Sequence, residues 1–146
     1  MIILVINCGS SSIKYQLLDM KNDDVYDVLA KGLVEKIGLE TGCLQHTATG
    51  KDKYVIDLPI PDHKVGMKLV LDALTDADHG VLKSLDDIEA VGHRIVHGGE
   101  YFSSSALVNE DVMKKIEICC DFAPLHNPAH LLGIRAVQAV LPSVPQ

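Results

Sequence analysis

Residues 4–14 have the sequence LVINCGSSSIK, in which an apolar stretch runs directly into a Gly-Ser-Ser-Ser turn. After the turn, polar and apolar residues alternate, so that Ser12 and Lys14 share one face of a second strand and Ile13 and Tyr15 share the other. Small residues in a tight turn allow backbone N–H groups and hydroxyls to approach a phosphate, because no side chain blocks the way. This stretch therefore predicts a β-hairpin whose turn binds phosphate.

Length and composition limit the possible functions. A chain of 146 residues forms one domain or two small lobes, and a hydrophobic content of 47% is enough for a packed core. The net charge of -7 argues against a nucleic acid partner, which requires a concentrated basic surface. No run of about 18 apolar residues occurs, so neither a membrane span nor a membrane partner is expected.

The cysteines and the N-terminal residues predict the cellular location. The chain has four cysteines: Cys8, Cys43, Cys119 and Cys120. Their spacing matches no zinc-binding pattern, and the adjacent pair at 119 and 120 is unfavourable for a disulfide framework. Residues 1–3 lack the basic segment of a signal peptide. We therefore expect reduced thiols in a cytoplasmic protein.

The hydrophobic periodicity changes along the chain and predicts a mixed α/β fold. Strands are expected at residues 2–7, from residue 12, and at 25–37, 43–49, 53–58 and 89–97. Helices are expected at residues 62–77, 110–122 and 127–140, with Asp62, Asn109 and Asn127 as their respective N-caps. The first strand is apolar up to Asn7, which predicts burial on both faces of the sheet. Residues 141–146 are expected to be either a frayed tail or the boundary before a further strand.

A first group of polar residues surrounds the hairpin turn. Lys14 offers a positive charge to phosphate oxygens, Ser10 and Ser12 offer hydroxyl donors, and the Asn7 amide oxygen suits magnesium or a magnesium-bound water. The turn is not a Walker A loop, because the required order of glycines and lysine is absent and a strand follows it. The alternative interpretation is a polar hairpin with a solvated lysine.

A second group lies in the segment VGHRIVHGGE, residues 91–100. Strand alternation places Arg94 on one face with Gly92 and Val96, and His93, Ile95 and His97 on the other. A guanidinium binds a carboxylate or phosphate through two parallel hydrogen bonds, and Val96 offers a wall to a short alkyl group. The alternatives are a salt bridge for Arg94 and structural roles for His93 and His97.

A third group, APLHNP, occupies residues 123–128. Leu125 and His126 precede the N-terminus of the last expected helix, where free N–H groups favour anions. Leu125 can form a second apolar wall, and His126 can donate a hydrogen bond to a phosphoryl oxygen. The alternative is an ordinary helix-entry loop.

Together, residues 4–14, 90–100 and 122–133 resemble the acetate kinase family over the whole chain. The resemblance implies the fold of the acetate and sugar kinase, Hsc70 and actin superfamily. It also implies magnesium-dependent phosphoryl transfer between ATP and acetate, giving ADP and acetyl phosphate. By motif, Asn7 matches a magnesium-site residue and Lys14 a residue assigned to ATP. The remaining matches are active-site serines (Ser10 and Ser12), the acetate-site arginine (Arg94), the methyl pocket (Val96 and Leu125) and an active-site histidine (His126).

The resemblance also implies that residues 1–146 are an N-terminal domain. Family members are more than twice as long, and their C-terminal domain, absent from this chain, supplies an aspartate, a second histidine, a second arginine and the adenosine-binding loops. We therefore expect little activity from the isolated chain and a homodimeric full-length parent. A propionate or butyrate kinase fragment and a non-enzymatic phosphate-binding module are the alternatives.

Overall fold

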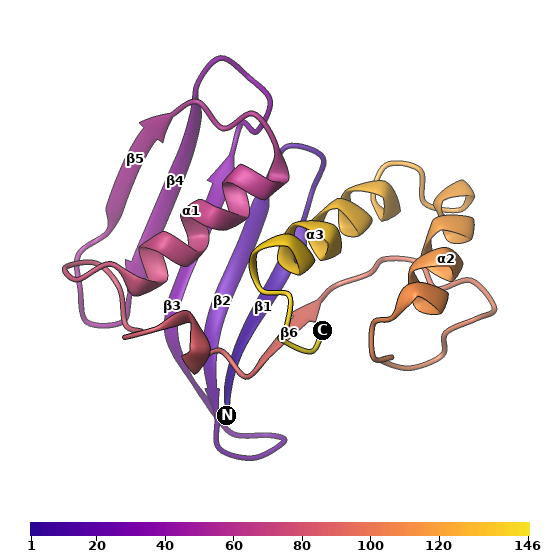
Figure 1. Cartoon of the computed structure of the whole chain (residues 1–146), viewed down its shortest axis with the longest axis horizontal. Helices are drawn as coiled ribbons and strands as arrows, with labels where there is room; N and C mark the ends of the chain where they lie inside the picture. The colour runs from indigo at the N-terminus through magenta and orange to yellow at the C-terminus, as the bar shows by residue number, and fades with distance from the viewer.

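The computed structural model describes all 146 residues and contains one six-stranded mixed sheet with the strand order β5-β4-β3-β2-β1-β6 (Figure 1). The strands are β1 (Ile2–Cys8), β2 (Ile13–Met20), β3 (Tyr26–Glu35), β4 (Gly42–Ala48), β5 (Tyr54–Leu58) and β6 (Ala90–His93). Strands β1 to β5 form an antiparallel meander, and β6 pairs in parallel with β1. The expected mixed α/β architecture is confirmed.

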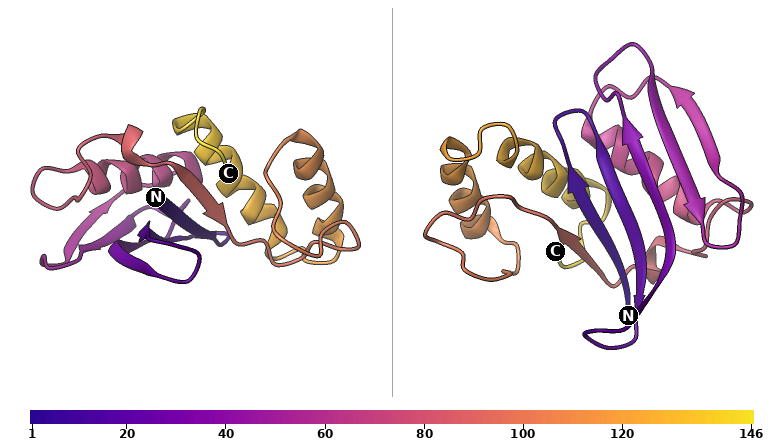
Figure 2. Two further views of the ribbon diagram at one scale, coloured as in Figure 1. Left: turned by 90° about the horizontal axis from the view of Figure 1, so that it is seen from below. Right: turned by 180° about the vertical axis from the view of Figure 1, so that it is seen from behind.

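Three α-helices accompany the sheet: α1 (His63–Thr75), α2 (Glu110–Ile118) and α3 (Asn127–Val140). Helices α1 and α3 pack on the same face of the sheet, and the opposite face carries no helix (Figure 2). No helix combines the length and apolar character needed to cross a bilayer. Two of the expected N-caps are confirmed, because Asp62 accepts a hydrogen bond from Val65 N–H and Asn109 accepts one from Val112 N–H.

The one-sided covering corrects the expectation that β1 is buried on both faces. Leu4 and Ile6 are buried beneath the helices, whereas Val5, on the opposite face, is 36% exposed. A continuous apolar run is typical of strands with helices on both faces, but here only one face is covered. The helix-free face therefore remains open, and the polar residues of β1 and β2 lie on it.

The expected strand at 89–97 is much shorter, since β6 ends at His93. The backbone N–H of Arg94 donates to Ile6 O (3.1 Å), close to the end of β1, and the chain then leaves the sheet. The alternation used to assign residues 95–97 to faces therefore does not apply to them. That part of the sequence-based prediction was wrong.

The C-terminal residues are held against β6, which corrects the frayed-tail alternative. Pro145 O accepts a hydrogen bond from Val91 N–H (2.9 Å), and Gln146 O accepts one from Val108 N–H (2.8 Å). Leu141 is buried in the main hydrophobic core. These contacts bring the last residues beside the outer edge of β6.

Candidate functional site

The turn between β1 and β2 is fixed by three hydrogen bonds. Gly9 N–H donates to Ser12 O (2.9 Å), and Ile37 N–H donates to Ser11 O (3.0 Å). The His63 ring, at the first turn of α1, donates from Nε2 to Gly9 O (2.7 Å). A Cβ at position 9 would lie 2.7 Å from the Ser12 hydroxyl oxygen, so the Ser12 side chain would have to shift. The turn is therefore held in place by α1 and by the backbone just after β3.

The two serines of the turn that are predicted to bind phosphate differ in their exposure to solvent. Ser10 is exposed and Ser12 is half-buried.

Cys8, just before the turn, is buried, and burial raises the pKa of its thiol to about 12. This thiol therefore stays protonated at neutral pH and is a packing residue, not a nucleophile.

Lys14 on β2, Asn7 on β1 and Arg94, the first residue after β6, form a row at one end of the sheet. Asn7 is paired with Lys14 in the β1–β2 register, and Ile6 is paired with His93 in the β1–β6 register. Arg94 follows His93 and therefore lies beside Asn7. Since neighbouring strands are about 4.8 Å apart, the backbone of the row spans about 10 Å. Asn7 and Lys14 lie on the helix-free face, whereas Arg94 lies beyond the end of β6, where its charge also helps to lower the pKa of His130 in α3. Sequence reasoning put these residues in two separate groups, and the sheet brings them together.

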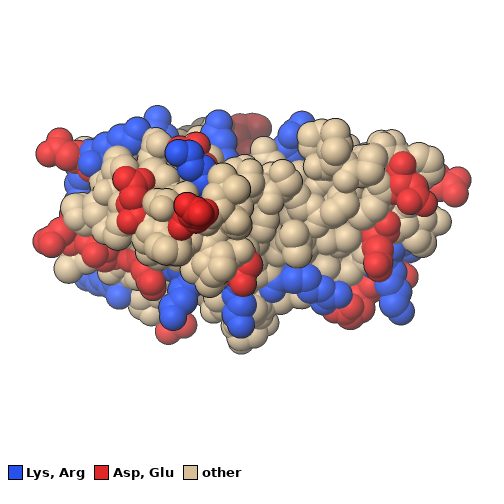
Figure 3. Space-filling view, turned by 90° about the horizontal axis from the view of Figure 1, so that it is seen from above, with Lys and Arg blue, Asp and Glu red and all other residues tan.

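Both cations of this row are available to a ligand. Arg94 and Lys14 are exposed, and neither belongs to any ion pair of the chain. This contradicts the alternative in which Arg94 forms a salt bridge with one of the 20 acidic residues. In the view of Figure 3, acidic and basic side chains are interspersed, without a continuous basic surface.

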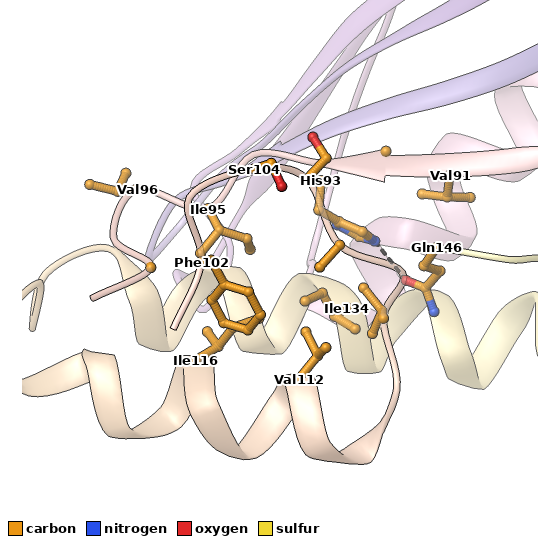
Figure 4. Close-up of a pocket in the computed structure, with 15 residues that line it drawn as sticks. Val91, His93, Ile95, Val96, Phe102, Ser104, Val112, Ile116, Ile134 and Gln146 are labelled. Atoms are coloured by element: carbon orange, nitrogen blue, oxygen red, sulfur yellow. Dashed lines mark hydrogen bonds between the residues drawn. The ribbon is translucent and has the colours of Figure 1, made fainter. Parts of the chain in front are cut away.

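A cavity of about 560 Å³ lies between β6, the 94–108 loop, α2 and α3. Apolar side chains from these elements converge on it: Ile95, Phe102, Val112, Ile116 and Ile134 (Figure 4). Val96 also lines the cavity, but Leu125 does not and is 79% exposed. Ile95 and Val96 thus border the same space, although strand alternation assigned them to opposite faces.

His93 closes one end of the cavity. Its Nε2 donates to the Gln146 side-chain oxygen (2.6 Å), as drawn in Figure 4. Burial lowers the pKa of His93, because desolvation disfavours the imidazolium form. A neutral His93 that is hydrogen-bonded to the C-terminal residue agrees with the structural role that was one alternative for this histidine.

Asn127 departs from its expected role as an N-cap. It is the first residue of α3, after the cap position His126, and its side chain is fully buried. Its Nδ2 donates to His97 O (2.9 Å), and its Oδ1 accepts from His97 N–H (3.3 Å). The amide is therefore used to bind the main chain of the 94–99 loop and does not cap the helix.

His126 lies exposed at the N-terminus of α3, and one turn further along the helix His130 is buried. The two rings stack with centroids 6.5 Å apart. Neither nitrogen of His130 has a hydrogen-bond partner, and burial is the main cause that lowers its pKa. No local sequence signal marks His63 or Asn127 as a support of the site, because each binds a backbone group distant in sequence.

A metal ion would find few ligands in this chain. No group of three or more His, Cys, Asp or Glu side chains is suitably placed to hold one. Asn7 offers one amide oxygen on the open face, beside Arg94. Mg²⁺ keeps several waters and binds largely through substrate phosphates, so a single amide oxygen suits contact with a hydrated ion.

Comparison with known proteins agrees with the resemblance seen in the sequence. Residues 2–146 match the profile of the acetokinase family. The acetate kinase of Clostridium acetobutylicum is 57% identical over 142 residues, which are 97% of this chain and 34% of the relative. Acetate kinase 2 of Clostridium perfringens is 58% identical over 143 residues, 98% of this chain and 35% of the relative. The chain thus spans about a third of the length of the curated relatives it matches.

Solved structures show the same fold. The crystal structure of Porphyromonas gingivalis acetate kinase superimposes with a TM-score of 0.94 at 46% identity, covering 99% of this chain and 36% of that chain. A propionate kinase from Francisella tularensis superimposes with a TM-score of 0.85 at 41% identity, covering 99% of this chain and 35% of that chain. The expected fold class is confirmed.

Proposed function

This chain belongs to the acetokinase family, and we propose that it supplies the acetate-binding and phosphate-binding side of an acetate kinase active site. The reaction is ATP + acetate ⇌ ADP + acetyl phosphate. The row of Lys14, Asn7 and Arg94 beside the 9–12 turn carries this proposal. It offers two exposed, unpaired cations and a metal-compatible amide at one end of the sheet, which is what an anionic acyl and phosphoryl acceptor site requires.

Each residue of the site has a distinct role in this proposal. Arg94 binds the acetate carboxylate through paired hydrogen bonds and holds the attacking oxygen in place. Val96 and Leu125 enclose the methyl group. His126 donates to an oxygen of the transferring phosphoryl group, and the N-terminus of α3 favours the negative charge there.

The hairpin binds the phosphate chain of the nucleotide. Ser10 and Ser12 donate hydroxyl hydrogen bonds, and Lys14 binds a phosphate oxygen of ATP. Asn7 contacts the hydration shell of Mg²⁺, which when bound neutralises phosphate charge. The fixed conformation of the turn supports these roles, because donors that are already in position need no reorganisation during transfer.

We further propose that residues 1–146 act as the N-terminal domain of a longer, homodimeric kinase. The chain spans about a third of its relatives, and phosphoryl transfer requires charge on every side of the transferring group. The isolated chain is accordingly expected to have no significant turnover. Four free cysteines support a cytoplasmic location, and the proposal includes no nucleic acid or membrane partner.

The direct experiment is a chimera in which this chain replaces the segment it matches in Clostridium acetobutylicum acetate kinase. A coupled assay is expected to show turnover with ATP and acetate for the chimera and none for the isolated 146-residue chain. The same replacement in the Clostridium perfringens relative tests whether any failure depends on the host. Two folded chimeras without turnover, or an isolated chain as active as the chimera, would contradict the proposal.

Propionate kinase is the second candidate, because a propionate kinase from Francisella tularensis has the same fold over this chain. Val96 and Leu125 form only part of a pocket wall, and both are exposed. Comparing kcat/KM for acetate, propionate and butyrate in the chimera distinguishes the candidates. A higher value for acetate supports acetate kinase.

A further inference from the structure

The two loops that carry the proposed acyl-binding residues meet at one side chain. Val96 lies in the 94–99 loop, and Leu125 and His126 lie in the 122–126 loop that leads into α3. Asn127 follows His126 directly, and both ends of its amide bind the backbone of His97, the residue after Val96. The buried Asn127 amide thus connects the main chain next to Val96 to the main chain that carries Leu125.

A second contact joins the same two loops. The His97 ring stacks on Phe122 with centroids 5.2 Å apart and an interplanar angle of 20°. The Nδ1 atom of this ring accepts a hydrogen bond from Gly99 N–H (2.9 Å), which fixes the ring relative to its own loop. We call the Asn127–His97 hydrogen bonds together with the His97–Phe122 stack the loop clamp.

Side-chain packing alone does not hold the two walls in place. Val96 is 41% exposed and Leu125 is 79% exposed, so each makes few contacts that would fix its position. Asn127, in contrast, is fully buried and uses its amide donor and acceptor on one residue's backbone. Breaking these hydrogen bonds would leave buried polar groups without partners, which opposes separation of the loops.

We propose that Asn127 is a positioning residue that sets the distance between Val96 and the Leu125–His126 loop, and thereby the binding and selection of the acyl substrate. This inference rests on the proposed function. Asn127 does not touch the acyl group; it acts through the two loops that do. Discrimination of a single methylene depends on a fixed pocket width, so loosening the loop clamp relaxes selectivity before it abolishes turnover.

The test is carried out in the active chimera, with Asn127→Ala as the main variant. We expect the KM for acetate to rise about tenfold, because small displacements of positioning groups have large kinetic effects. The ratio of kcat/KM for acetate to that for propionate should move toward one. The KM for ATP should change less than about twofold, since the 9–12 turn is held by α1 and by the backbone just after β3, away from the loop clamp.

Three further variants make the result specific. Asn127→Asp keeps the acceptor for His97 N–H but sets a buried carboxylate oxygen against His97 O, so a shift at least as large as that of Asn127→Ala is expected. Phe122→Ala removes only the exposed His97–Phe122 stack and should shift the acetate-to-propionate ratio of kcat/KM in the same direction. It also tests the loop clamp if Asn127→Ala does not fold. Asn109→Ala is the matched control, because this asparagine caps α2 outside the loop clamp and should leave the ratio unchanged.

The outcomes separate this inference from the proposed function. Wild-type chimeras that fold but lack turnover contradict the proposed function, and the inference fails with it. An active chimera in which Asn127→Ala and Phe122→Ala both leave the acyl ratio unchanged contradicts the role of the loop clamp alone. An equal shift in Asn109→Ala also contradicts it, since the effect would then follow general stability.

Discussion

The sheet with α1 and the segment 94–126 are stabilised in different ways. A hydrophobic cluster of 21 buried residues joins the sheet to α1 and the C-terminal part of α3. The second cluster has only four buried residues: Val112, Met113, Ile116 and Ile134. The loops of this segment pack on this small cluster through Ile95, Phe102 and Val108, and the loop clamp joins them to the start of α3. The proposed site lies where the two regions meet, with its charged row on the sheet and its apolar walls on the loops.

Arg94→Ala tests the charged row and should have the largest effect of any single substitution in the proposed site. In the active chimera we expect kcat/KM for acetate to fall about 1,000-fold, or about 4 kcal/mol, because a desolvated charge-assisted pair is lost. A coupled assay with varied acetate measures this. The wall residues should matter less, since they contribute only apolar contacts.

Arg135→Ala is the matched control for Arg94. Arg135 is also exposed, but it binds Glu110 on the surface (2.8 Å), away from the row. Removing a solvent-exposed pair has little energetic consequence, so turnover should be unchanged. Similar losses in both variants would show that Arg94 has no specific role.

A pair of alanine substitutions in the two hydrophobic clusters tests whether the two regions unfold cooperatively. Leu17→Ala, in the large cluster, should lower the global free energy of unfolding by about 3 kcal/mol. Met113→Ala, in the small cluster, should lower it less and instead accelerate amide exchange within α2 and the neighbouring loop. Urea unfolding and hydrogen exchange measure the two effects. Equal losses of global stability in the two variants would mean that the regions unfold as one unit.

The contrast also explains which parts of the fold are predictable from the sequence. In β2 the alternation of residues 13–17 is produced by one buried face, and the local pattern is sufficient. The Asp62 cap depends on Val65, three positions further along the chain, so it can also be predicted from the local sequence. The length of β6 is not predictable, because the chain leaves the sheet although β1 continues to Cys8, and no local pattern indicates that departure.

Prediction of the site is limited in the same way. Residue type and spacing identify Arg94, Lys14 and the turn serines as binding candidates, but their side-by-side arrangement needs the strand register. The cap predicted at Asn127 is wrong, although asparagine before proline is typical of a helix start. Its actual partner, His97, is 30 residues away and no local pattern indicates it. The roles of the site residues in catalysis stay predictions until the chimera is assayed.

Three histidines, in β4, β6 and α3, give the fold a pH-dependent stability of smaller size. Burial lowers the pKa of His46, His93 and His130 from an ordinary value of 6.5. The folded state therefore binds fewer protons than the unfolded state, and stability is lost as pH falls below about 6.5. Urea unfolding at pH 7.5, 6.5 and 5.5 should show a steady decrease. A constant free energy of unfolding over this range would contradict the prediction.

His130→Leu assigns part of this dependence to one position. His130 is buried and neither ring nitrogen is hydrogen-bonded, so an apolar replacement of similar volume removes a desolvated polar group. The variant should be at least as stable as the wild type at neutral pH and should lose less stability on acidification. An unchanged pH dependence would exclude His130 as a contributor.

The helix caps provide the smallest and most local comparison. Asp62 and Asn109 each accept one backbone hydrogen bond at the start of a helix, from Val65 N–H and Val112 N–H, both at 2.8 Å. Replacing either residue by alanine removes about 1 kcal/mol of helix stability. If α1 is part of the main cooperative unit, Asp62→Ala should lower the global free energy of unfolding by this full amount. Asn109→Ala should appear mainly as faster amide exchange in α2, because the segment 94–126 opens before the sheet does. The two caps have equal bond lengths, but Asp62 also carries a charge that favours the helix N-terminus, so Asp62→Asn is compared with Asp62→Ala to separate the effect of charge from that of the region.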